Sequence, residues 1–370
     1  MATTRFTSPD SDLDKLYDDF AREDVQPLWT QHGLLPATPN GLRPHLWRGT
    51  TVRALAERAG DLVGIDRGGD RRVISLSHPG LGGLPFATHT LWAALQYLKG
   101  GELAPAHRHS PAALRFVLEG DGVWTLVNGD PLAMGPGDLV LTPSYTWHEH
   151  HNAGDQPMIW FDGLDLPLIR NLDAIFFEPG PDTLSSYEPA ETSASQVRYG
   201  TAGLLPLSPT DDRQVEGPGS GIHSRLLTYR WADTDAALTG LLKAGNGADY
   251  ASVRFCDPAT GRDIMPTLRA EMHRIAPGGK TPATRTVGSS VWVVYHGTGS
   301  SVIDGVRYTW REGDMFAVPS WAAAGHAADA HSAAGADIFV LSDGPVIEAI
   351  GLGRTETLPG GQRVTSESDL

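Results

Sequence analysis

Residues 137–144 read GDLVLTPS, and residues 313–320 read GDMFAVPS. In each segment a Gly-Asp turn leads into a short apolar run that ends at Pro-Ser, a pattern typical of a β-strand that leaves a tight turn. A second pair lies upstream at nearly the same offset, because EGDG at 119–122 corresponds to HGTG at 296–299. Two matches in the same order predict that the chain contains one strand-rich unit twice.

Short strands are expected around the first copy of this repeat. The chain holds 43 glycines and 27 prolines, which favour turns and short elements over long helices. Asn128-Gly129 follows an apolar run and predicts a tight hairpin. Strands at this turn spacing predict a sandwich or a barrel. The expected strands cover 113–118, 122–127, 139–141 and 146–150.

Two short helices are expected before the strands begin. Apolar residues recur at helical spacing over 13–20, and Pro27 would stop that helix. A second helix is expected over 51–59, ended by Gly60. The stretch 181–221 is rich in Ser, Thr, Pro and Gly, which indicates a connection between domains.

Composition excludes several classes of function. The net charge of −15 argues against general attraction to nucleic acid or anionic lipid. Cys256 is the only cysteine, so the chain has no internal disulfide, zinc finger or iron–sulfur site. Residues 1–20 carry five aspartates and no apolar run, unlike a signal peptide or membrane span. These features predict a cytoplasmic protein that binds neither nucleic acid nor membrane.

Two histidine clusters lie in the first copy of the repeat, about forty residues apart. Because side chains alternate along a strand, His107 and His109 should share one face of their strand. His148 and His150 should likewise share one face of another strand, while Glu149 points to the opposite face. Several imidazoles meeting inside a barrel predict a transition-metal site. The clusters read AHRHS at 106–110 and WHEHH at 147–151.

The second copy of the repeat lacks most of these histidines. At the same offset, Thr284 replaces His107, Thr286 replaces His109 and Ala324 replaces His148, whereas His326 corresponds to His150. One metal ion per chain is therefore predicted, in the N-terminal barrel. The remaining histidines are expected to be structural, among them His273 and His326, and His151 to be exposed on the outer strand face.

The paired motifs resemble those of cupins, and their duplication resembles a bicupin. Cupins usually carry a glutamate ligand shortly after His-x-His, but 110–114 reads SPAAL. A three-histidine cupin followed by a barrel without ligands resembles the gentisate 1,2-dioxygenase family, which includes salicylate and 1-hydroxy-2-naphthoate 1,2-dioxygenases. Further segments carry this resemblance along nearly the whole chain: PLW at 27–29, RGGDRR at 67–72, NGDP at 128–131 and DIMPTLR at 263–269.

This resemblance implies a mainly β fold of two double-stranded β-helix (jelly-roll) barrels with short N-terminal helices. The expected organisation is an N-terminal helical arm with loops packed on the barrels over 1–85 and a metal-binding barrel over 86–180. A linker over 181–221 then leads to a barrel without metal ligands over 222–370. A homotetramer is expected from the same resemblance.

The resemblance also implies roles for individual residues. Fe(II), one ion per chain in the N-terminal barrel, would be held by His107, His109 and His148. The expected catalytic groups are His150, Arg115 and Asp162. The substrate carboxylate and its neighbouring oxygen would contact Arg67, Arg71 and Arg115, with Trp92, Ala94 and Gln96 lining the pocket. The sequence leaves open whether Arg71 or Arg72 faces the pocket.

The implied reaction is cleavage of gentisate by O2 between the carboxylated and the adjacent hydroxylated carbon, which gives maleylpyruvate. Three neutral imidazoles leave the charge of the metal intact, which suits an anionic chelating substrate, and arginine forks suit its carboxylate. The same reaction on salicylate, substituted salicylates or 1-hydroxy-2-naphthoate is the alternative. A non-catalytic metal-binding bicupin is a further alternative. A manganese decarboxylase or a sugar-phosphate isomerase would be expected to keep the carboxylate ligand.

Overall fold

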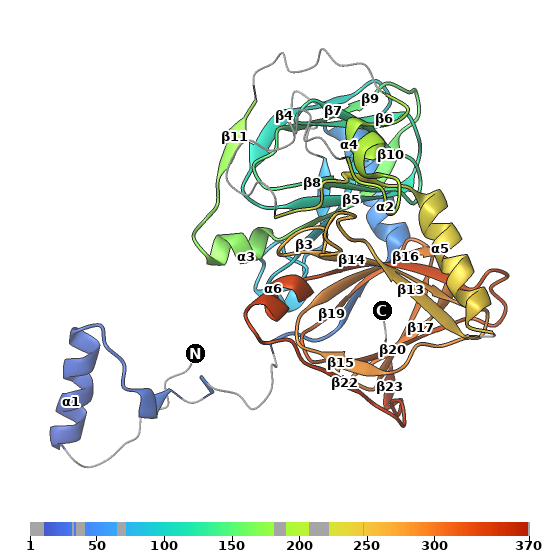
Figure 1. Cartoon of the computed structure of the whole chain (residues 1–370). Helices are drawn as coiled ribbons and strands as arrows, with labels where there is room; N and C mark the ends of the chain where they lie inside the picture. Colours follow the sequence, from blue (N-terminus) through green and yellow to red (C-terminus); the bar gives the residue numbers. More distant parts are fainter. Residues whose placement is uncertain are drawn as a thin grey trace. The chain divides into compact units, whose positions relative to one another are not determined.

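The computed structural model describes residues 11–31, 33–34, 41–64, 72–180, 190–206, 222–246 and 248–368. The chain forms two compact units, Met1–Asn40 and Gly41–Leu370. The first unit contains α1 (Ser11–Arg22) and the 3-10 helix η1 (Leu28–Thr30). The expected helix over 13–20 is therefore confirmed. The second unit contains the strands of two β-barrels (Figure 1).

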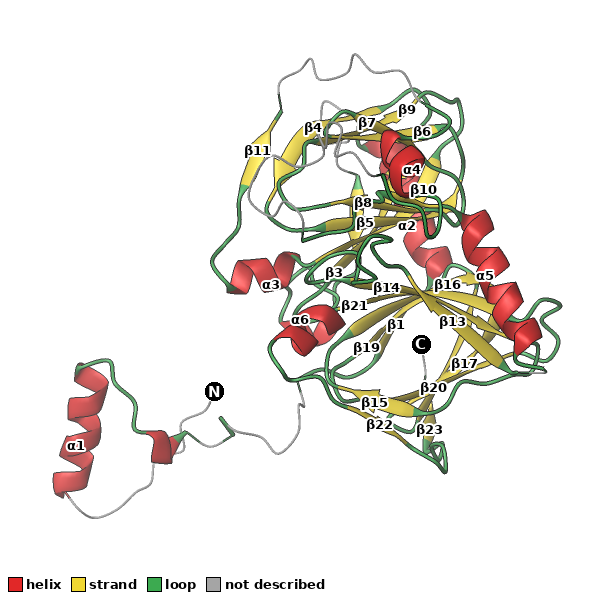
Figure 2. Ribbon diagram, in the orientation of Figure 1, coloured by secondary structure: helices red, strands yellow, loops and turns green. Residues whose placement is uncertain are grey.

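Two sheets face each other in the N-terminal barrel, and their strands are antiparallel (Figure 2). The first sheet has the order β12 (Thr228–Tyr229), β8 (Leu139–Thr142), β5 (Ala113–Glu119), β10 (Met158–Leu164), β3 (Trp92–Leu98) and β2 (Val73–Ser75). The second has the order β11 (Phe177–Pro179), β4 (Leu103–His109), β9 (His148–Asn152), β6 (Val123–Val127) and β7 (Asp130–Ala133).

The C-terminal barrel is built in the same way, so the expected pair of β-barrels is confirmed. Its first sheet has the order β1 (His45–Trp47), β19 (Met315–Val318), β16 (Ser290–His296), β21 (Ala336–Ser342), β14 (Arg269–Ile275) and β13 (Tyr250–Arg254). Its second sheet has the order β22 (Thr355–Thr357), β15 (Thr284–Thr286), β20 (Ala323–Ala328), β17 (Thr298–Ile303), β18 (Val306–Arg311) and β23 (Ser366–Glu367).

Each barrel takes one edge strand from the other half of the sequence. β1 precedes the N-terminal barrel in the chain but pairs with β19 of the C-terminal barrel. In return, β12 follows the N-terminal barrel and pairs with β8. Short helices flank the strands: α2 (Gly49–Leu62), η4 (Pro79–Leu81), α3 (Leu166–Asn171), α4 (Ala194–Tyr199), α5 (Trp231–Ala244) and α6 (Gly344–Ala349).

The duplication holds at the level of strand register. His107 lies directly opposite His148 where β4 pairs with β9. At the corresponding place in the second barrel, Thr284 lies opposite Ala324 where β15 pairs with β20. The offset taken from the turn motifs therefore identifies equivalent positions, and the second barrel has no histidine at any of these ligand positions.

The hairpin expected at Asn128-Gly129 is also confirmed. Asn128 has a φ of 45° and Gly129 a φ of 86°, and they connect β6 to β7. Two consecutive residues with positive φ form the type I′ turn, which matches the twist of the two strands. Asn and Gly are the residues that adopt this conformation at least cost.

Two expectations about local structure need correction, and a third, the linker, is not tested. Helix α2 continues past Gly60 to Leu62, because Gly60 provides close packing: a Cβ there would lie 2.6 Å from the Tyr97 ring. Strand β9 begins at His148, because Thr146 still belongs to the preceding turn and hydrogen-bonds back to Pro143. The linker expected over 181–221 lies largely outside the described residues, although α4 occupies part of it.

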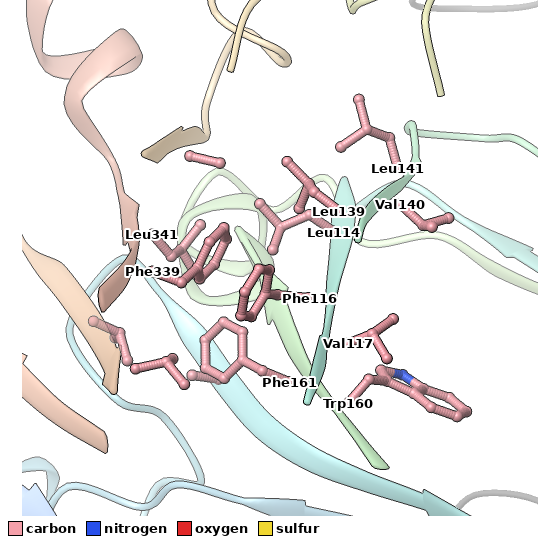
Figure 3. Close-up of a cluster of buried hydrophobic side chains, with 14 of the residues drawn as sticks. Leu114, Phe116, Val117, Leu139, Val140, Leu141, Trp160, Phe161, Phe339 and Leu341 are labelled. Atoms are coloured by element: carbon pink, nitrogen blue, oxygen red, sulfur yellow. The ribbon is translucent and has the colours of Figure 1, made fainter. Parts of the chain in front are cut away.

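A shared apolar core joins the two barrels. Phe116 of β5 stacks on Phe339 of β21 with ring centroids 4.3 Å apart, and Phe161 of β10 contacts the same ring edge-on (Figure 3). These rings belong to one cluster of buried side chains drawn from both halves of the chain. The boundaries expected at 85, 180 and 221 stay predictions. Among the described residues, no helix is long and apolar enough to cross a membrane.

Candidate active site

Two neighbouring strands of the N-terminal barrel supply the clustered histidines. His107 pairs with His148 across β4 and β9, and His109 lies two residues further along β4 on the same face. The register shifts between Ala104 and His107, so Pro105 falls in a β-bulge, where a residue without an N–H is tolerated. The bulge ends at the first of the clustered histidines.

Three of the predicted histidines come within reach of a single ion. One ring nitrogen from each of His107, His109 and His148 lies within 4.8 Å of the others. The ring centroid of His148 is 4.3 Å from that of His107 and 4.8 Å from that of His109. His150 lies beside this group, with its centroid 6.1 Å from that of His148.

Backbone carbonyls fix the orientation of all three rings. Nδ1 of each ring lies 2.7–2.9 Å from the carbonyl oxygen of a residue two positions away in the chain. A carbonyl oxygen can only accept a hydrogen bond, so Nδ1 carries the proton and Nε2 keeps its lone pair. Anchoring of this kind is typical of metal-binding histidines. The accepting carbonyls belong to Pro105, Pro111 and Thr146.

Burial favours the neutral imidazole that a metal requires. It lowers the pKa of His148 well below the ordinary value, and His107 and His109 lower that pKa further. Burial and the nearby His107 lower the pKa of His109 to about 4. Neither ring has to lose a proton at neutral pH before it binds a metal ion.

The donor set fits a transition-metal ion. Nε2 of His148 is buried and forms no hydrogen bond within the described part of the chain. An unpartnered buried nitrogen is unfavourable, and coordination to a metal would satisfy its lone pair. Sets of imidazole ligands suit iron, zinc, copper or nickel. The geometry therefore accepts iron but does not select it over these other metals.

His150 differs from the clustered histidines in the partner of its Nδ1. That nitrogen lies 2.8 Å from Oγ1 of Thr125, which is directly opposite on β6. The same hydroxyl donates to Sδ of Met134 at 3.0 Å. A hydroxyl has a single proton, so when Thr125 donates to Met134 it accepts from His150, and Nδ1 of His150 then carries the proton. Nε2 of His150 is left as a buried acceptor without a partner among the described residues.

Arg115 and Asp162 form a buried pair on the facing sheet. They lie opposite each other across β5 and β10, with Arg115 Nε 3.4 Å from Asp162 Oδ1. Arg115 Nη1 donates to Thr142 Oγ1 at 2.7 Å, and Trp160 Nε1 donates to Asp162 Oδ1 at 3.1 Å. Burial raises the pKa of Asp162 to about 6, although Arg115 and Trp160 act against the rise. Burial lowers the pKa of His150 well below its ordinary value, and the charge of Arg115 lowers it further.

The expected pocket residues of β3 share the face that carries Asp162. Ala94 lies opposite Asp162, and Gln96 lies opposite Trp160. Trp92 is two residues before Ala94, so alternation puts it on the same face. The structure therefore brings the predicted lining residues to the sheet that faces the histidines. Their contacts with a substrate stay predictions.

The structure describes one of the three arginines in the RGGDRR segment at 67–72. Arg67 and Arg71 lie outside the described residues. Arg72 is buried, donates to the Val63 carbonyl at 2.8 Å and forms an ion pair with Glu102. Its guanidinium is thus engaged by the Val63 carbonyl and the Glu102 carboxylate.

Glu149 points away from the clustered histidines, as alternation requires. Its Oε1 lies 3.1 Å from Nε2 of His151 on the same outer face of β9. The expectation that His151 is exposed is wrong, because its side chain is only 16% exposed. The ring stacks on Trp124 with centroids 4.1 Å apart and an interplanar angle of 5°.

Sequence reasoning missed the residues that support the site. Thr125 and Thr142 each contact a predicted group on another strand, whereas Trp160 contacts Asp162 on its own strand, β10. The available signal was weak: a hydroxyl within the otherwise apolar strand VWTLV at 123–127. Only the register of the sheets identifies which histidine that hydroxyl meets.

Known proteins share both the sequence and this architecture. A cupin domain model matches residues 94–164. A gentisate 1,2-dioxygenase from Streptomyces sp is 47% identical over 93% of this chain and 95% of its own length. The chain belongs to the gentisate 1,2-dioxygenase family. Like the other members of this family it is a dioxygenase, an oxidoreductase of aromatic compound catabolism with a bicupin fold.

Other members of the gentisate 1,2-dioxygenase family act on related acids. A 5-aminosalicylate 1,2-dioxygenase from Comamonas sp is 35% identical over 98% of this chain and 96% of its own length. A crystal structure of salicylate 1,2-dioxygenase from Pseudoaminobacter salicylatoxidans with gentisate adducts is 41% identical, with a TM-score of 0.88 and 97% coverage of both chains. Membership in this family and the three-histidine group together indicate a metal centre in the present enzyme.

Proposed function

We propose that this enzyme uses Fe(II) to open the ring of gentisate with O2, between the carboxylated carbon and the adjacent hydroxylated carbon, and releases maleylpyruvate. The observation that carries the proposal is the group of three imidazoles whose Nδ1 atoms are anchored to backbone carbonyls, which makes Nε2 the nitrogen that each ring can offer to a metal ion. His107, His109 and His148 would hold one Fe(II) in the N-terminal barrel. When bound, the ion would supply a template for the chelating substrate and a path for electrons from ring to O2.

Arg115 would bind the substrate carboxylate. It is buried, its Nε has no hydrogen-bond partner among the described residues, and the Asp162 carboxylate holds its position from the neighbouring strand. A guanidinium presents several N–H groups in one plane, which suits a carboxylate better than a point charge. Arg67 and Arg71 would add positive charge, and Trp92, Ala94 and Gln96 would line the ring.

His150 would accept the hydrogen bond, and then the proton, of a substrate hydroxyl. Thr125 and Met134 leave Nε2 of His150 as its acceptor nitrogen, and that nitrogen has no partner among the described residues. A neutral imidazole in this tautomer can hold a proton at Nε2 during ring opening. Asp162 would act through Arg115 by keeping the guanidinium in place.

Gentisate is the preferred substrate of this proposal because the relative at 47% identity is named for it. Salicylate, substituted salicylates and 1-hydroxy-2-naphthoate remain alternatives, since they share the carboxylate and ortho hydroxyl that the same groups would bind.

The test is to load the protein with Fe(II) in the absence of air and then supply O2 with one acid at a time. The acids are gentisate, salicylate, 5-aminosalicylate and 1-hydroxy-2-naphthoate. The proposal predicts one O2 consumed per gentisate ring opened, with an ultraviolet spectrum of maleylpyruvate. Turnover of another acid in place of gentisate would change the substrate. Iron binding without O2 uptake on any of these acids would refute the proposed class of substrate.

A further inference from the structure

The C-terminal barrel encloses a cavity of about 610 Å³. This volume lies within the range of small-molecule sites. Thr284 and Ala324, the counterparts of His107 and His148, both line it. The cavity therefore occupies the place in the second barrel that the clustered histidines occupy in the first.

The side chains around this cavity reverse the charge pattern of the first barrel. In the first barrel one row across the sheet carries Arg115, Asp162 and Ala94. The equivalent row of the second barrel carries Trp292, Val340 and Glu271. An indole thus replaces the cation, and a carboxylate appears on the strand where the first barrel has a methyl group.

The surroundings of Glu271 favour its ionised, carboxylate form. Its Oε2 lies 2.9 Å from Nε2 of His273, and Nδ1 of His273 lies 2.9 Å from the hydroxyl of Tyr250. Burial raises the pKa of Glu271, but the hydrogen bond and charge of His273 and the charge of Arg269 outweigh it, so the pKa lies below its ordinary value. The side chain is 30% exposed and lines the cavity, so a ligand can reach it.

The arginines of the lining are already engaged. Arg269 donates to both oxygens of Asp263 and to both oxygens of Glu348, at 2.8–2.9 Å. Arg354 lies over the ring of Trp321, 4.4 Å from its centroid. The lining contains these two arginines and three carboxyl side chains, which are Glu271, Asp343 and Glu348. It therefore favours positive over negative ligands, the opposite of a site for aromatic acids.

An aromatic wall completes the cavity. The ring centroid of Trp292 lies 4.1 Å from that of His326, and both side chains line the cavity. Burial lowers the pKa of His326 to about 3, so this imidazole adds no positive charge at neutral pH. An indole offers a large apolar surface against which the ring of a ligand can pack.

We propose that the C-terminal barrel is a second ligand site, for a small organic cation whose ammonium group pairs with Glu271 and whose apolar part lies against Trp292. The site does not use the metal centre of the first barrel. The ligand would bind whether or not the dioxygenase reaction proposed above takes place.

Calorimetric titration of the full-length, iron-loaded protein tests this site with three probes of the same ring and similar size. Benzylammonium is positive, benzyl alcohol is neutral and benzoate is negative. The proposal predicts saturable binding of benzylammonium at one site per chain, with benzyl alcohol at least about tenfold weaker, a difference of about 1.4 kcal/mol. Benzoate should give no binding that depends on the second barrel.

Two variants locate the binding. Glu271→Gln keeps the size of the side chain and should weaken benzylammonium binding at least about tenfold, by about 1.4 kcal/mol. Ala324→Leu narrows the cavity and should weaken binding as well. His148→Ala, in the other barrel, should leave benzylammonium binding intact. Oxygen uptake with the best acid substrate reports whether the two second-barrel variants are folded, because that reaction is assigned to the first barrel.

The proposal is overturned if benzylammonium shows no saturable binding at millimolar concentrations. It is equally overturned if benzylammonium binds both folded second-barrel variants as it binds the unmodified protein. Benzoate binding that Ala324→Leu abolishes would place an anion site in the cavity and refute the assigned charge. Failure of the dioxygenase assay alone would leave the binding result standing, since the two measurements do not depend on each other.

Discussion

His150 differs from the three clustered histidines in the group that its Nδ1 contacts. A backbone carbonyl can only accept a hydrogen bond, so it fixes the tautomer of each clustered ring whatever the surrounding side chains are. The tautomer of His150 depends instead on a hydroxyl, and that hydroxyl depends on the sulfur of Met134. Side-chain substitution can therefore change His150 without touching the metal ligands.

Replacing Thr125 by Val should lower kcat while leaving the iron content unchanged. The change removes the oxygen that accepts the Nδ1 proton of His150, so the ring loses its fixed tautomer and orientation. Loss of such a supporting group typically lowers activity by about 10–100-fold. Steady-state oxygen uptake and iron analysis of the purified variant measure the two effects.

Thr125→Ser is the matched control, because it keeps the hydroxyl and loses one methyl group. Its kcat should stay within about threefold of the unmodified enzyme. Equal losses in both variants would mean that packing, and not the hydroxyl, supports His150. A loss of iron in Thr125→Val would also contradict the assigned role.

Arg115→Met should destabilise the fold by about 3 kcal/mol, because it leaves the Asp162 carboxylate buried without its counter-charge. The double variant Arg115→Met/Asp162→Asn should recover part of this loss, since no buried charge remains. Chemical denaturation above pH 7 gives the free energies of unfolding for the cycle. Losses that simply add would show that the two side chains do not interact.

The clustered histidines could be predicted from the sequence because alternation along a strand is a local property. His107 and His109, and His148 and His150, need only the strand to face inward. Thr125 and Arg72 could not be assigned in this way. Their partners, His150 and Glu102, are set by which strands pair and in which register, and that information is not local.

At the scale of elements, turn chemistry was the most reliable guide. Asn128-Gly129 predicted its hairpin because few residue pairs tolerate positive φ at two consecutive positions. Gly60 misled the prediction of α2, because its small size serves packing against Tyr97 and not a helix end. A glycine reports either backbone conformation or close approach, and the sequence alone does not distinguish them.

The turn after β10 contains a buried carboxyl group that responds to pH. Oδ1 of Asp165 accepts from the Ala112 N–H at 2.8 Å, and Oδ2 accepts from Thr267 Oγ1 at 2.5 Å. Burial raises the pKa of Asp165 to about 6, from 3.8, although both hydrogen bonds act against the rise. The folded protein thus holds this proton up to a higher pH than the unfolded chain.

Ionisation of Asp165 should therefore weaken the fold as the pH rises from about 4 to about 6. The free energy of unfolding, taken relative to Asp165→Asn, should fall over this interval by up to about 3 kcal/mol. The asparagine does not titrate and keeps an oxygen for the Ala112 N–H. Denaturation of both proteins across this range gives the difference, and a difference that rises with pH would contradict the assigned pKa.

At the scale of the whole molecule, the duplication was visible in the turn motifs, but the joining of the barrels was not. The exchanged strands β1 and β12 each pair with the barrel from the other half of the chain. Short edge strands carry little sequence signal, and their pairing depends on distant residues. The core around Phe116, Phe161 and Phe339 likewise belongs to neither barrel alone.

Phe339→Ala should destabilise both barrels together, by about 3–5 kcal/mol. Phe339 is fully buried against Phe116 of the other barrel, so the cavity left by the missing ring opens at their junction. Chemical denaturation should show one cooperative transition at lower denaturant, with iron released in the same step. Two separate transitions, with iron retained through the first, would mean that the barrels fold independently.

The central claim is that one metal ion, held by the histidines of the first barrel, supports the activity. Iron content and gentisate-dependent oxygen uptake of His148→Ala test it directly, with the exposed His331→Ala as the matched control. The account predicts one iron per chain and full turnover in His331→Ala, and the loss of both in His148→Ala. A His148→Ala protein that keeps one iron per chain, or keeps its turnover, would contradict it.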